Sequence, residues 1–171
     1  MGSESAVPRV SVFIGGQVSS ISILFTCLAG SSHDRNGYGR LMKLLIIDDN
    51  PEFRLLISTQ LRSRNMTVFA AADIIQAIGT AREKRPDVIL LDIEMPGGDG
   101  FLVLERLKAN KLLSAIPVII LTARDPKEVE SKALKIGAVS SLQKPVNIEN
   151  LMIVIEQALN TSHQTGGPQP A

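Results

Sequence analysis

Cysteine, histidine and aromatic residues are scarce in this chain of 171 residues, and each scarcity excludes a class of function. There is one cysteine, there are two histidines, and none of them lies between positions 34 and 162. That stretch therefore cannot hold a zinc site of the usual Cys/His type, nor use Ser-His or Cys-His nucleophilic catalysis. Aromatic residues make up 4% of the chain, so surfaces that stack nucleic-acid bases are not expected.

The charge balance indicates whether the protein binds nucleic acid, and the cysteine content indicates its redox compartment. The formal net charge is +1 and charged residues make up 20% of the chain. Modules that bind nucleic acid usually carry a basic patch, so we expect no direct contact with nucleic acid. The lone Cys27 cannot form an internal disulfide, which fits a reducing compartment and predicts a cytoplasmic protein.

The two ends of the chain differ in composition from its middle. Residues 1–41 are rich in serine and glycine, and no charged residue lies between positions 10 and 32. Glycine and serine interrupt this stretch too often for a membrane span, and it resembles a signal peptide only poorly. We favour an extension outside the fold, disordered or with a mis-assigned start, and expect no membrane contact. The tail 161–171 contains glycine and proline, and we expect it to be disordered.

Between these ends, short apolar runs alternate five times with segments of helical periodicity. Five β-α units predict an α/β fold: a five-stranded parallel sheet with five helices, doubly wound in the flavodoxin-like manner. We place this single domain at residues 42–160. The expected strands cover residues 43–47, 67–70, 88–91, 117–121 and 139–142, and the expected helices begin near Pro51, Asp73, Gly100, Asp125 and Asn147.

Polar residues follow four of the five expected strands, namely the pair Asp48-Asp49, Asp92, Thr122 and Lys144. The carboxyl ends of parallel strands lie at one edge of a sheet, where binding sites form. Three carboxylates gathered there would repel one another unless a cation lay among them. A hard cation with oxygen ligands, Mg²⁺ or Mn²⁺, is the natural candidate.

This set of side chains suits phosphoryl transfer, which depends mainly on positioning and charge stabilisation. One carboxylate can attack phosphorus while the other two hold Mg²⁺. The lysine adds a positive charge and the threonine hydroxyl adds a hydrogen bond to the phosphoryl oxygens. Taken singly, each residue has a simpler interpretation, such as a helix cap or a solvated surface lysine. Only one of Asp48 and Asp49 can cap a helix, however, and the joint placement at four strand ends favours the functional interpretation.

The motifs and their order resemble those of response-regulator receiver domains, over about residues 42–160. The matching segments are Asp48-Asp49, the run from Leu91 to Gly100, Leu121-Thr122-Ala123, and Lys144-Pro145. The resemblance implies that Asp92 accepts a phosphoryl group and that Asp48, Asp49, Asp92 and the backbone carbonyl of Glu94 bind Mg²⁺. It also implies that Thr122 and Lys144 contact the phosphoryl oxygens and that the Lys144–Pro145 bond is cis.

One position departs from the family pattern. Many members carry tyrosine or phenylalanine three residues before the lysine, and an inward turn of that ring accompanies activation. Ser141 stands there in this chain and is too small to fill the pocket. Either the switch uses other residues, such as Thr122 and the loop after it, or the output is unusual, or the change is drift at a strand position. The side chain of Glu94 is expected to shape access to Asp92.

The resemblance implies a stand-alone phosphorelay protein and not an enzyme, since it would catalyse only its own phosphorylation and dephosphorylation. Its partners would be a histidine kinase or a histidine phosphotransfer protein and a separate downstream effector. In the family the effector commonly binds the face formed by the fourth helix, the fifth strand and the fifth helix.

Three alternative functions predict different sequence features. A pseudo-receiver would serve only for docking or dimerisation, but it would lack the site aspartate or lysine. A phosphohydrolase of the haloacid-dehalogenase type would carry an Asp-x-Asp nucleophile loop and a cap. A flavin-binding protein of the same topology would carry serine and threonine after the first strand, where this chain has Asp48-Asp49.

Overall fold

The computed structural model describes residues 10–14, 17–21, 40–95 and 100–164. Residues 96–99 of the motif after Asp92 lie outside the described residues, as do Cys27, His33 and residues 165–171 of the predicted tail. The elements are β1 (Val10–Ile14), β2 (Gln17–Ile21), β3 (Lys43–Ile47), α1 (Pro51–Arg62), β4 (Thr67–Ala71), α2 (Ile74–Lys84), β5 (Val88–Asp92), α3 (Gly100–Ala109), β6 (Val118–Thr122), α4 (Pro126–Ile136), β7 (Ser140–Gln143) and α5 (Ile148–Gln164).

The five strands from β3 onward form a parallel sheet in the order β7-β6-β5-β3-β4. This order confirms the predicted five-stranded parallel sheet with five helices. Four strands differ from the predicted limits by one residue at one or both ends, because hydrogen bonding extends past the apolar run at each carboxyl end.

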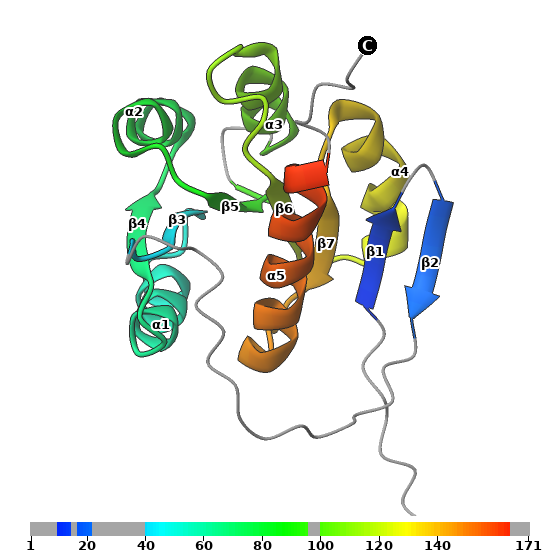
Figure 1. Cartoon of the computed structure of the whole chain (residues 1–171), viewed down its shortest axis with the longest axis horizontal. Coiled ribbons are helices and arrows are strands. Elements are labelled where there is room, and N and C mark those ends of the chain that lie inside the picture. Colours follow the sequence, from blue (N-terminus) through cyan, green and yellow to red (C-terminus); the bar gives the residue numbers. More distant parts are fainter. Residues whose placement is uncertain (1–9, 15–16, 22–39, 96–99, 165–171) are drawn as a thin grey trace, which may run out of the picture.

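Alternation along the buried strands divides the core into two layers, one on each face of the sheet. On one face, Leu45, Ile89 and Ile120 pack with apolar residues of α2, α3 and α4. On the other face, Leu44, Leu90 and Ile119 pack with apolar residues of α1 and α5. Figure 1 shows the helices on both sides of the sheet, as a doubly wound fold requires.

Helix starts follow from side chains that cap the first turn. Asn50 accepts hydrogen bonds from the backbone N–H groups of Glu52 and Phe53, at 2.9 and 3.1 Å. Asp73 caps α2 and Asp125 caps α4 in the same manner. These caps begin each helix shortly after a strand, so that the loops between them are short and gather at one edge of the sheet.

Two further strands, β1 and β2, extend the sheet beyond β7 as an antiparallel pair. They were not predicted, because the serine- and glycine-rich composition of residues 1–41 favours an extension outside the fold, although Gly15-Gly16 is a turn signal between two short stretches of residues. The domain limits 42–160 remain a prediction, since pairing at the sheet edge does not decide whether residues 1–41 are needed for folding.

At the other end of the chain, α5 continues to Gln164, so the first four residues of the predicted disordered tail are helical instead. The helical periodicity of Leu151, Ile155 and Leu159 carries the helix on through residues that lack a stop signal. None of the helices in the described part of the chain is long and apolar enough to cross a membrane.

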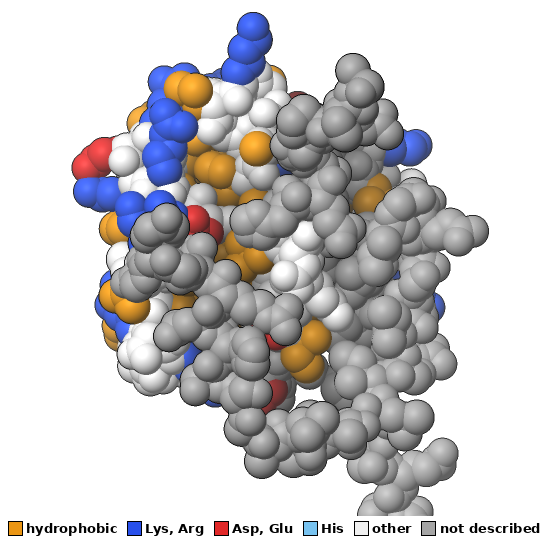
Figure 2. All heavy atoms as spheres, in the orientation of Figure 1, with side chains coloured by type: hydrophobic (Ala, Val, Ile, Leu, Met, Phe, Trp, Pro, Cys, Tyr) orange, Lys and Arg blue, Asp and Glu red, His pale blue; other side chains and the backbone are white. Residues whose placement is uncertain are grey.

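Basic side chains gather over α2 at the upper left of Figure 2. The last turn of that helix carries Arg82 and Lys84, which complement the partial negative charge of its C-terminus. Because α2 runs antiparallel to the parallel strands that it connects, its C-terminal end lies at the amino edge of the sheet. The acidic residues lie at the opposite, carboxyl edge. The basic side chains therefore do not line the candidate site.

Candidate functional site

The residues singled out in the sequence lie together at the carboxyl edge of the parallel sheet. Asp48 follows β3, Asp92 and Thr122 are the last residues of β5 and β6, and Lys144 follows β7. Pairing of β5 with β6 sets Asp92 opposite Leu121. The backbone N–H of Lys144 donates to the Thr122 carbonyl at 2.8 Å, which ties the loop after β7 to the end of β6.

The ammonium of Lys144 bridges the two buried carboxylates. Its Nζ atom lies 2.7 Å from Oδ2 of Asp48 and 2.8 Å from Oδ2 of Asp92. It also lies 4.5 Å from the centroid of the Phe53 ring, so an aromatic face covers one side of the ammonium. One cation therefore holds two carboxylates from different strands in a common orientation.

Asp48 and Asp49 differ in exposure although they are neighbours in sequence. Asp48 is fully buried, whereas Asp49 is exposed. Burial raises the pKa of Asp48 above its ordinary value of 3.8, although hydrogen bonds from Lys144 and from the Asn50 N–H lower it. The negative charge of Asp92 also raises the pKa of Asp48. The site thus disfavours negative charge at Asp48 and gains from any additional cation.

The pKa of Lys144 is the result of two opposing effects. Burial lowers it, but the hydrogen bonds and charges of Asp48 and Asp92 outweigh burial and hold it above the ordinary value of 10.5. Lys144 is therefore a permanent cation at neutral pH. A phosphoryl group that arrived at this edge would meet a positive charge already in position.

Asp92 is oriented by its own loop as well as by Lys144. Its Oδ1 atom accepts a hydrogen bond from the backbone N–H of Glu94 at 3.0 Å. Gly100, at the start of α3, packs directly on this backbone, because a Cβ there would overlap the Asp92 carbonyl oxygen and Ile93 Cα. The absence of a side chain at Gly100 is what lets α3 begin this close to the acidic residue.

The side chain of Glu94 reaches across to the loop after β6. Its carboxylate accepts a hydrogen bond from the backbone N–H of Ala123 and forms an ion pair with Arg124, whose Nε lies 3.0 Å from Oε1. The hydroxyl of Thr122 accepts a hydrogen bond from the backbone N–H of Arg124 at 3.0 Å. The loops after β5 and β6 are thereby joined beside Asp92.

Two further predicted residues lie on or after β7. The Lys144–Pro145 peptide bond is cis, as the resemblance implied. Ser141 is buried within β7, and its Oγ atom makes no hydrogen bond to the described residues. The structure therefore places Ser141 inside the molecule, three residues before the lysine of the site.

The acidic residues fit a divalent cation. Asp48, Asp49 and Asp92 each offer one carboxylate oxygen, and these three oxygens lie within 4.8 Å of one another. Carboxylate oxygens are the ligands that Mg²⁺ prefers, and Mg²⁺ completes its octahedral coordination with water and substrate oxygens. Burial, and to a smaller extent the charge of Asp92, raise the pKa of Asp48, and a cation bound beside these carboxylates would oppose both effects.

Three residues at the site were missed in the sequence. Phe53 covers Lys144, Arg124 pairs with Glu94, and Arg54 donates to the Asp48 carbonyl at 2.6 Å. Phe53 and Arg54 lie in the first turn of the helix after Asp48-Asp49, and this proximity could have drawn attention to them. The pairing of Arg124 with Glu94 joins two loops 30 residues apart, and no sequence pattern indicates it.

Comparison with known proteins agrees with this geometry. The family model described as "Response regulator receiver domain" matches residues 44–156. The KDP operon transcriptional regulatory protein KdpE of Escherichia coli (strain K12) is 33% identical over 130 residues, covering 76% of this chain and 56% of KdpE. The chain thus spans only about half the length of that relative.

Other similar proteins are matched over nearly their whole length. Sporulation initiation phosphotransferase F of Bacillus subtilis (strain 168) is 32% identical over 117 residues, which cover 68% of this chain and 93% of that protein. The high-resolution structure of chemotaxis response regulator CheY4 of Vibrio cholerae aligns with a TM-score of 0.65 and 29% identity, covering 70% of this chain and 100% of CheY4. With the acidic cluster and its lysine in place at the sheet edge, the chain belongs to the response regulator receiver domain family.

Proposed function

We propose that this chain is a phosphoacceptor in a two-component phosphorelay, taking a phosphoryl group onto Asp92 from a phosphohistidine. The donor would be a histidine kinase or a histidine phosphotransfer protein. The observation that carries the proposal is the contact of Lys144 Nζ with both Asp48 and Asp92 at the carboxyl edge of the sheet. That contact sets a permanent cation against the carboxylate that would react.

The proposed reaction is an in-line displacement at phosphorus. A carboxylate oxygen of Asp92 forms a bond to phosphorus, the bond from phosphorus to the donor's imidazole nitrogen breaks, and that nitrogen keeps the electron pair and takes up a proton. Lys144 and the hydroxyl of Thr122 would contact the phosphoryl oxygens. The hydrogen bond from the Glu94 N–H to Oδ1 orients Asp92 for this attack.

Asp48, Asp49, Asp92 and the backbone carbonyl of Glu94 would hold Mg²⁺. The ion would neutralise charge on the phosphoryl group, and its other coordination positions would be open to phosphoryl and water oxygens. The residues themselves supply the orientation: the Asn50 N–H fixes Asp48 through Oδ1 at 2.9 Å, and Lys144 fixes Oδ2.

Phosphorylation would shift an equilibrium between two arrangements of the site loops and change a surface that a separate effector protein recognises. The pair Glu94–Arg124 joins the loops after β5 and β6, so it lies where such a change would begin. We propose that the protein works in the cytoplasm, without direct contact with nucleic acid or membrane. Catalysis would be limited to its own phosphorylation and dephosphorylation.

The proposal is tested by intact mass after incubation with Mg²⁺ and acetyl phosphate. We expect one phosphoryl adduct on the parent protein and none on Asp92→Ala. Asp87→Ala is the matched control. Asp87 lies far from the site, where it pairs with Arg40 and with the backbone N–H of Lys43. This variant should keep the adduct. A folded parent protein without any adduct would contradict the proposal and favour a pseudo-receiver that serves for docking or dimerisation.

The phosphohydrolase alternative differs in turnover. A phosphohydrolase would release phosphate continuously from a generic ester such as p-nitrophenyl phosphate. The proposed phosphoacceptor would show no sustained release, because its loop reads Asp92-Ile93-Glu94 and lacks the second aspartate of an Asp-x-Asp nucleophile loop.

A further inference from the structure

The sheet of this protein does not end at β7, where the parallel part ends. Strand β1 pairs antiparallel with β7, with Ser11 opposite Ser141 and Val12 opposite Ser140. Strand β2 pairs in turn with β1 along its whole length, from Val10 opposite Ile21 to Ile14 opposite Gln17. Figure 1 shows the two strands continuing the sheet past β7, and β1 also contacts α5.

Without β1, β7 would be an edge strand with unpaired backbone groups. Edge strands are usually protected by charged residues, proline or a bulge. The sequence of β7 is Ser140-Ser141-Leu142-Gln143, without a charge or a proline. This edge is therefore suited to accept another strand, and the chain itself supplies one.

The hairpin, defined as strands β1 and β2, depends on β7 in its turn. An isolated two-stranded hairpin is at best marginally stable in water. β1 and β2 contain no charged residue and no proline, so they too lack the usual protection of an edge. Pairing with β7 gives β1 a hydrogen-bonded neighbour on both sides.

Strand β7, whose edge β1 covers, ends beside the candidate site. Lys144 comes immediately after β7, and β7 pairs with β6 up to Thr122 opposite Gln143. Ser141, which lies opposite Ser11, is buried with its hydroxyl unsatisfied among the described residues. The same short strand thus contacts the hairpin on one side and positions the site lysine at its end.

We propose that the hairpin is an intramolecular ligand of the β7 edge and that it competes with the effector for the face formed by α4, β7 and α5. This inference rests on the proposed function, because it assumes an effector that reads the phosphorylated state. Since the hairpin is tethered, its effective concentration at β7 is high and a partner must displace it. A phosphoryl group that favours the effector-binding arrangement would weaken the docking of the hairpin, and by linkage the docked hairpin would disfavour phosphorylation by the same factor.

The test traps the docked hairpin in the full chain by a disulfide. Cys27→Ser removes the native thiol, and two variants then carry paired cysteines, Ser11→Cys with Ser141→Cys, and Val12→Cys with Ser140→Cys. Residues directly opposite in an antiparallel pair have Cα atoms about 4.5 to 5.5 Å apart, within the range that a disulfide spans. We expect the cross-link to form under mild oxidation in at least one variant, read as lost free thiols in the intact mass.

The matched control combines Ser11→Cys with Ser63→Cys. Ser63 is an exposed serine at the end of α1, and α1 packs on β4, which lies at the opposite edge of the parallel sheet from β7. This control should keep both thiols free. Absence of a cross-link from both paired variants, in protein that unfolds cooperatively, would overturn the proposal, as would equal cross-linking in the control.

The regulatory part is tested by the rate of cross-linking with and without acetyl phosphate and Mg²⁺. We expect phosphorylated protein to cross-link at least about five-fold more slowly. An unchanged rate in protein that carries the phosphoryl adduct would overturn the competition. The adduct itself is read in the same mass spectrum, so failure of the phosphoacceptor function (no adduct) is distinguished from failure of the hairpin proposal (adduct without cross-link, or without a change in its rate).

Discussion

At the scale of single residues, Asp48 and Asp49 show how burial separates two adjacent carboxylates. Both offer an oxygen to the same candidate cation site. Asp48 is buried, and burial raises its pKa, whereas Asp49 is exposed to solvent. The two residues should therefore contribute alike to cation binding and differently to the stability of the fold.

The first prediction compares Asp48→Asn with Asp49→Asn at neutral pH. Each variant should weaken Mg²⁺ binding, because each loses one carboxylate ligand. Asp48→Asn should raise the free energy of unfolding, since it removes a buried charge that the fold disfavours, whereas Asp49→Asn should change it by less than about 0.5 kcal/mol. Titration with Mg²⁺ and urea denaturation without Mg²⁺ measure the two effects. Equal stability changes in both variants would contradict the assigned difference in burial.

The pH dependence of cation binding follows from the same shift. A raised pKa means that Asp48 takes up a proton at a higher pH than an ordinary aspartate, and this proton competes with Mg²⁺. Mg²⁺ affinity should therefore fall as the pH falls toward the acid range, and the fall should begin at a higher pH than for Asp48→Asn. A superimposable pH profile for parent and Asp48→Asn would show that Asp48 does not titrate in this range.

Sequence patterns were sufficient to predict most of the individual site residues, but they were insufficient to predict which residues contact them. Asp92 could be found because it ends an apolar run, and Lys144 could be found because it follows an expected strand and precedes Pro145 in a motif of the family. The pairing of Glu94 with Arg124 could not, since it depends on how far two loops approach each other in space. Which of Asp48 and Asp49 is buried also depends on the direction of the chain after β3.

At the scale of the elements, the start of α3 is governed by one glycine. The helix begins at Gly100 against the backbone of Asp92 and Ile93, where no Cβ can be accommodated. Gly79, within α2, is exposed and has no atom near its Cβ position. A side chain therefore cannot be added at Gly100 without moving the backbone, whereas it can be added freely at Gly79.

The second prediction exploits this contrast. Gly100→Ala should destabilise the protein by about 1 to 3 kcal/mol, because the helix start must move away from β5. Gly79→Ala should stabilise it by about 0.5 to 1 kcal/mol, because alanine is the better helix former. Urea denaturation of both variants measures the difference. A neutral Gly100→Ala variant would show that α3 does not pack on the Asp92 backbone as described.

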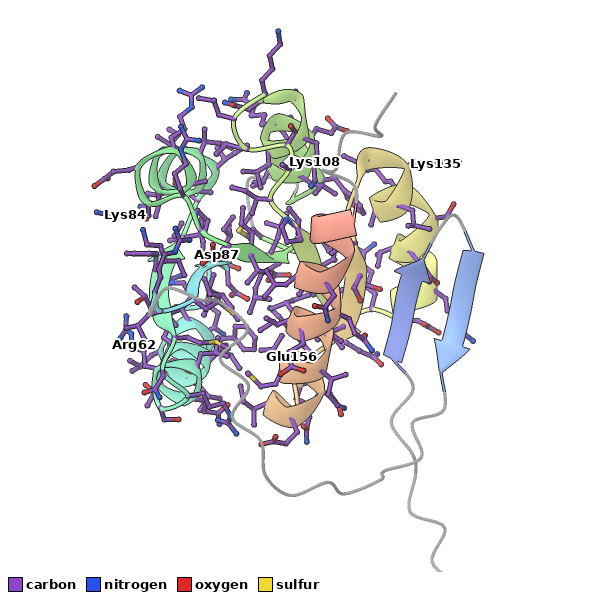
Figure 3. The ribbon with its side chains drawn as sticks, in the orientation of Figure 1. Arg62, Lys84, Asp87, Lys108, Lys135 and Glu156 are labelled. Atoms are coloured by element: carbon purple, nitrogen blue, oxygen red, sulfur yellow. The ribbon has the colours of Figure 1, made fainter. Side chains whose placement is uncertain are left out.

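Lys108 connects α3 to the elements that follow it. Its Nζ atom donates to the carbonyls of Ser114 and Ile116 at 3.0 and 2.8 Å, and its aliphatic stem passes beside Gly137 at the end of α4. Figure 3 shows Lys108 at the end of α3. Burial lowers the pKa of Lys108 from 10.5 to about 8.

The third prediction follows from the sign of that shift. Between pH 8 and 10.5 the folded protein binds fewer protons at Lys108 than the unfolded chain does, so its contribution to stability increases with pH. The slope contributed by this residue should approach about 1.4 kcal/mol per pH unit within that window. Urea denaturation at several pH values should show this contribution in the parent protein and not in Lys108→Met. Parallel pH profiles would contradict the assigned burial of the ammonium.

The elements themselves followed closely from local patterns. The helix starts expected near Pro51, Asp73 and Asp125 are reproduced, because the side chains of Asn50, Asp73 and Asp125 cap α1, α2 and α4. α5 is longer than predicted, because no glycine or proline stops its periodicity before Gln164. β1 and β2 were not predicted, since their stability depends on pairing with an edge at the far end of the chain and not on a local signal.

At the scale of the whole molecule, the two hydrophobic clusters join all five helices to the two faces of the parallel sheet. Among the residues whose burial the structure describes, the members of both clusters follow position 41, with Met42 packed against one of them. β1 adds to the sheet by pairing with β7 at the edge. Residues 42–171 should therefore contain the determinants of the fold and of the candidate site.

The fourth prediction is that a chain beginning at Met42 folds and keeps the site. We expect cooperative urea unfolding, a far-ultraviolet circular dichroism spectrum of an α/β protein, and a Mg²⁺ affinity within about three-fold of the full chain, since the ligands and their supports all lie beyond position 41. The full chain is the control. Loss of cooperative unfolding in the shorter chain would show that the predicted domain limits 42–160 omit a required segment.

The proposed phosphorelay function requires that Asp92, and not a neighbouring carboxylate, accepts the phosphoryl group. Borohydride reduces an aspartyl phosphate to homoserine, which marks the modified residue for peptide sequencing by mass spectrometry. After incubation with Mg²⁺ and acetyl phosphate, we predict homoserine at position 92 alone, with aspartate retained at Asp48 and Asp49. Homoserine at position 48 or 49, or at no position in a folded protein, would contradict the assignment of Asp92 as the phosphoacceptor.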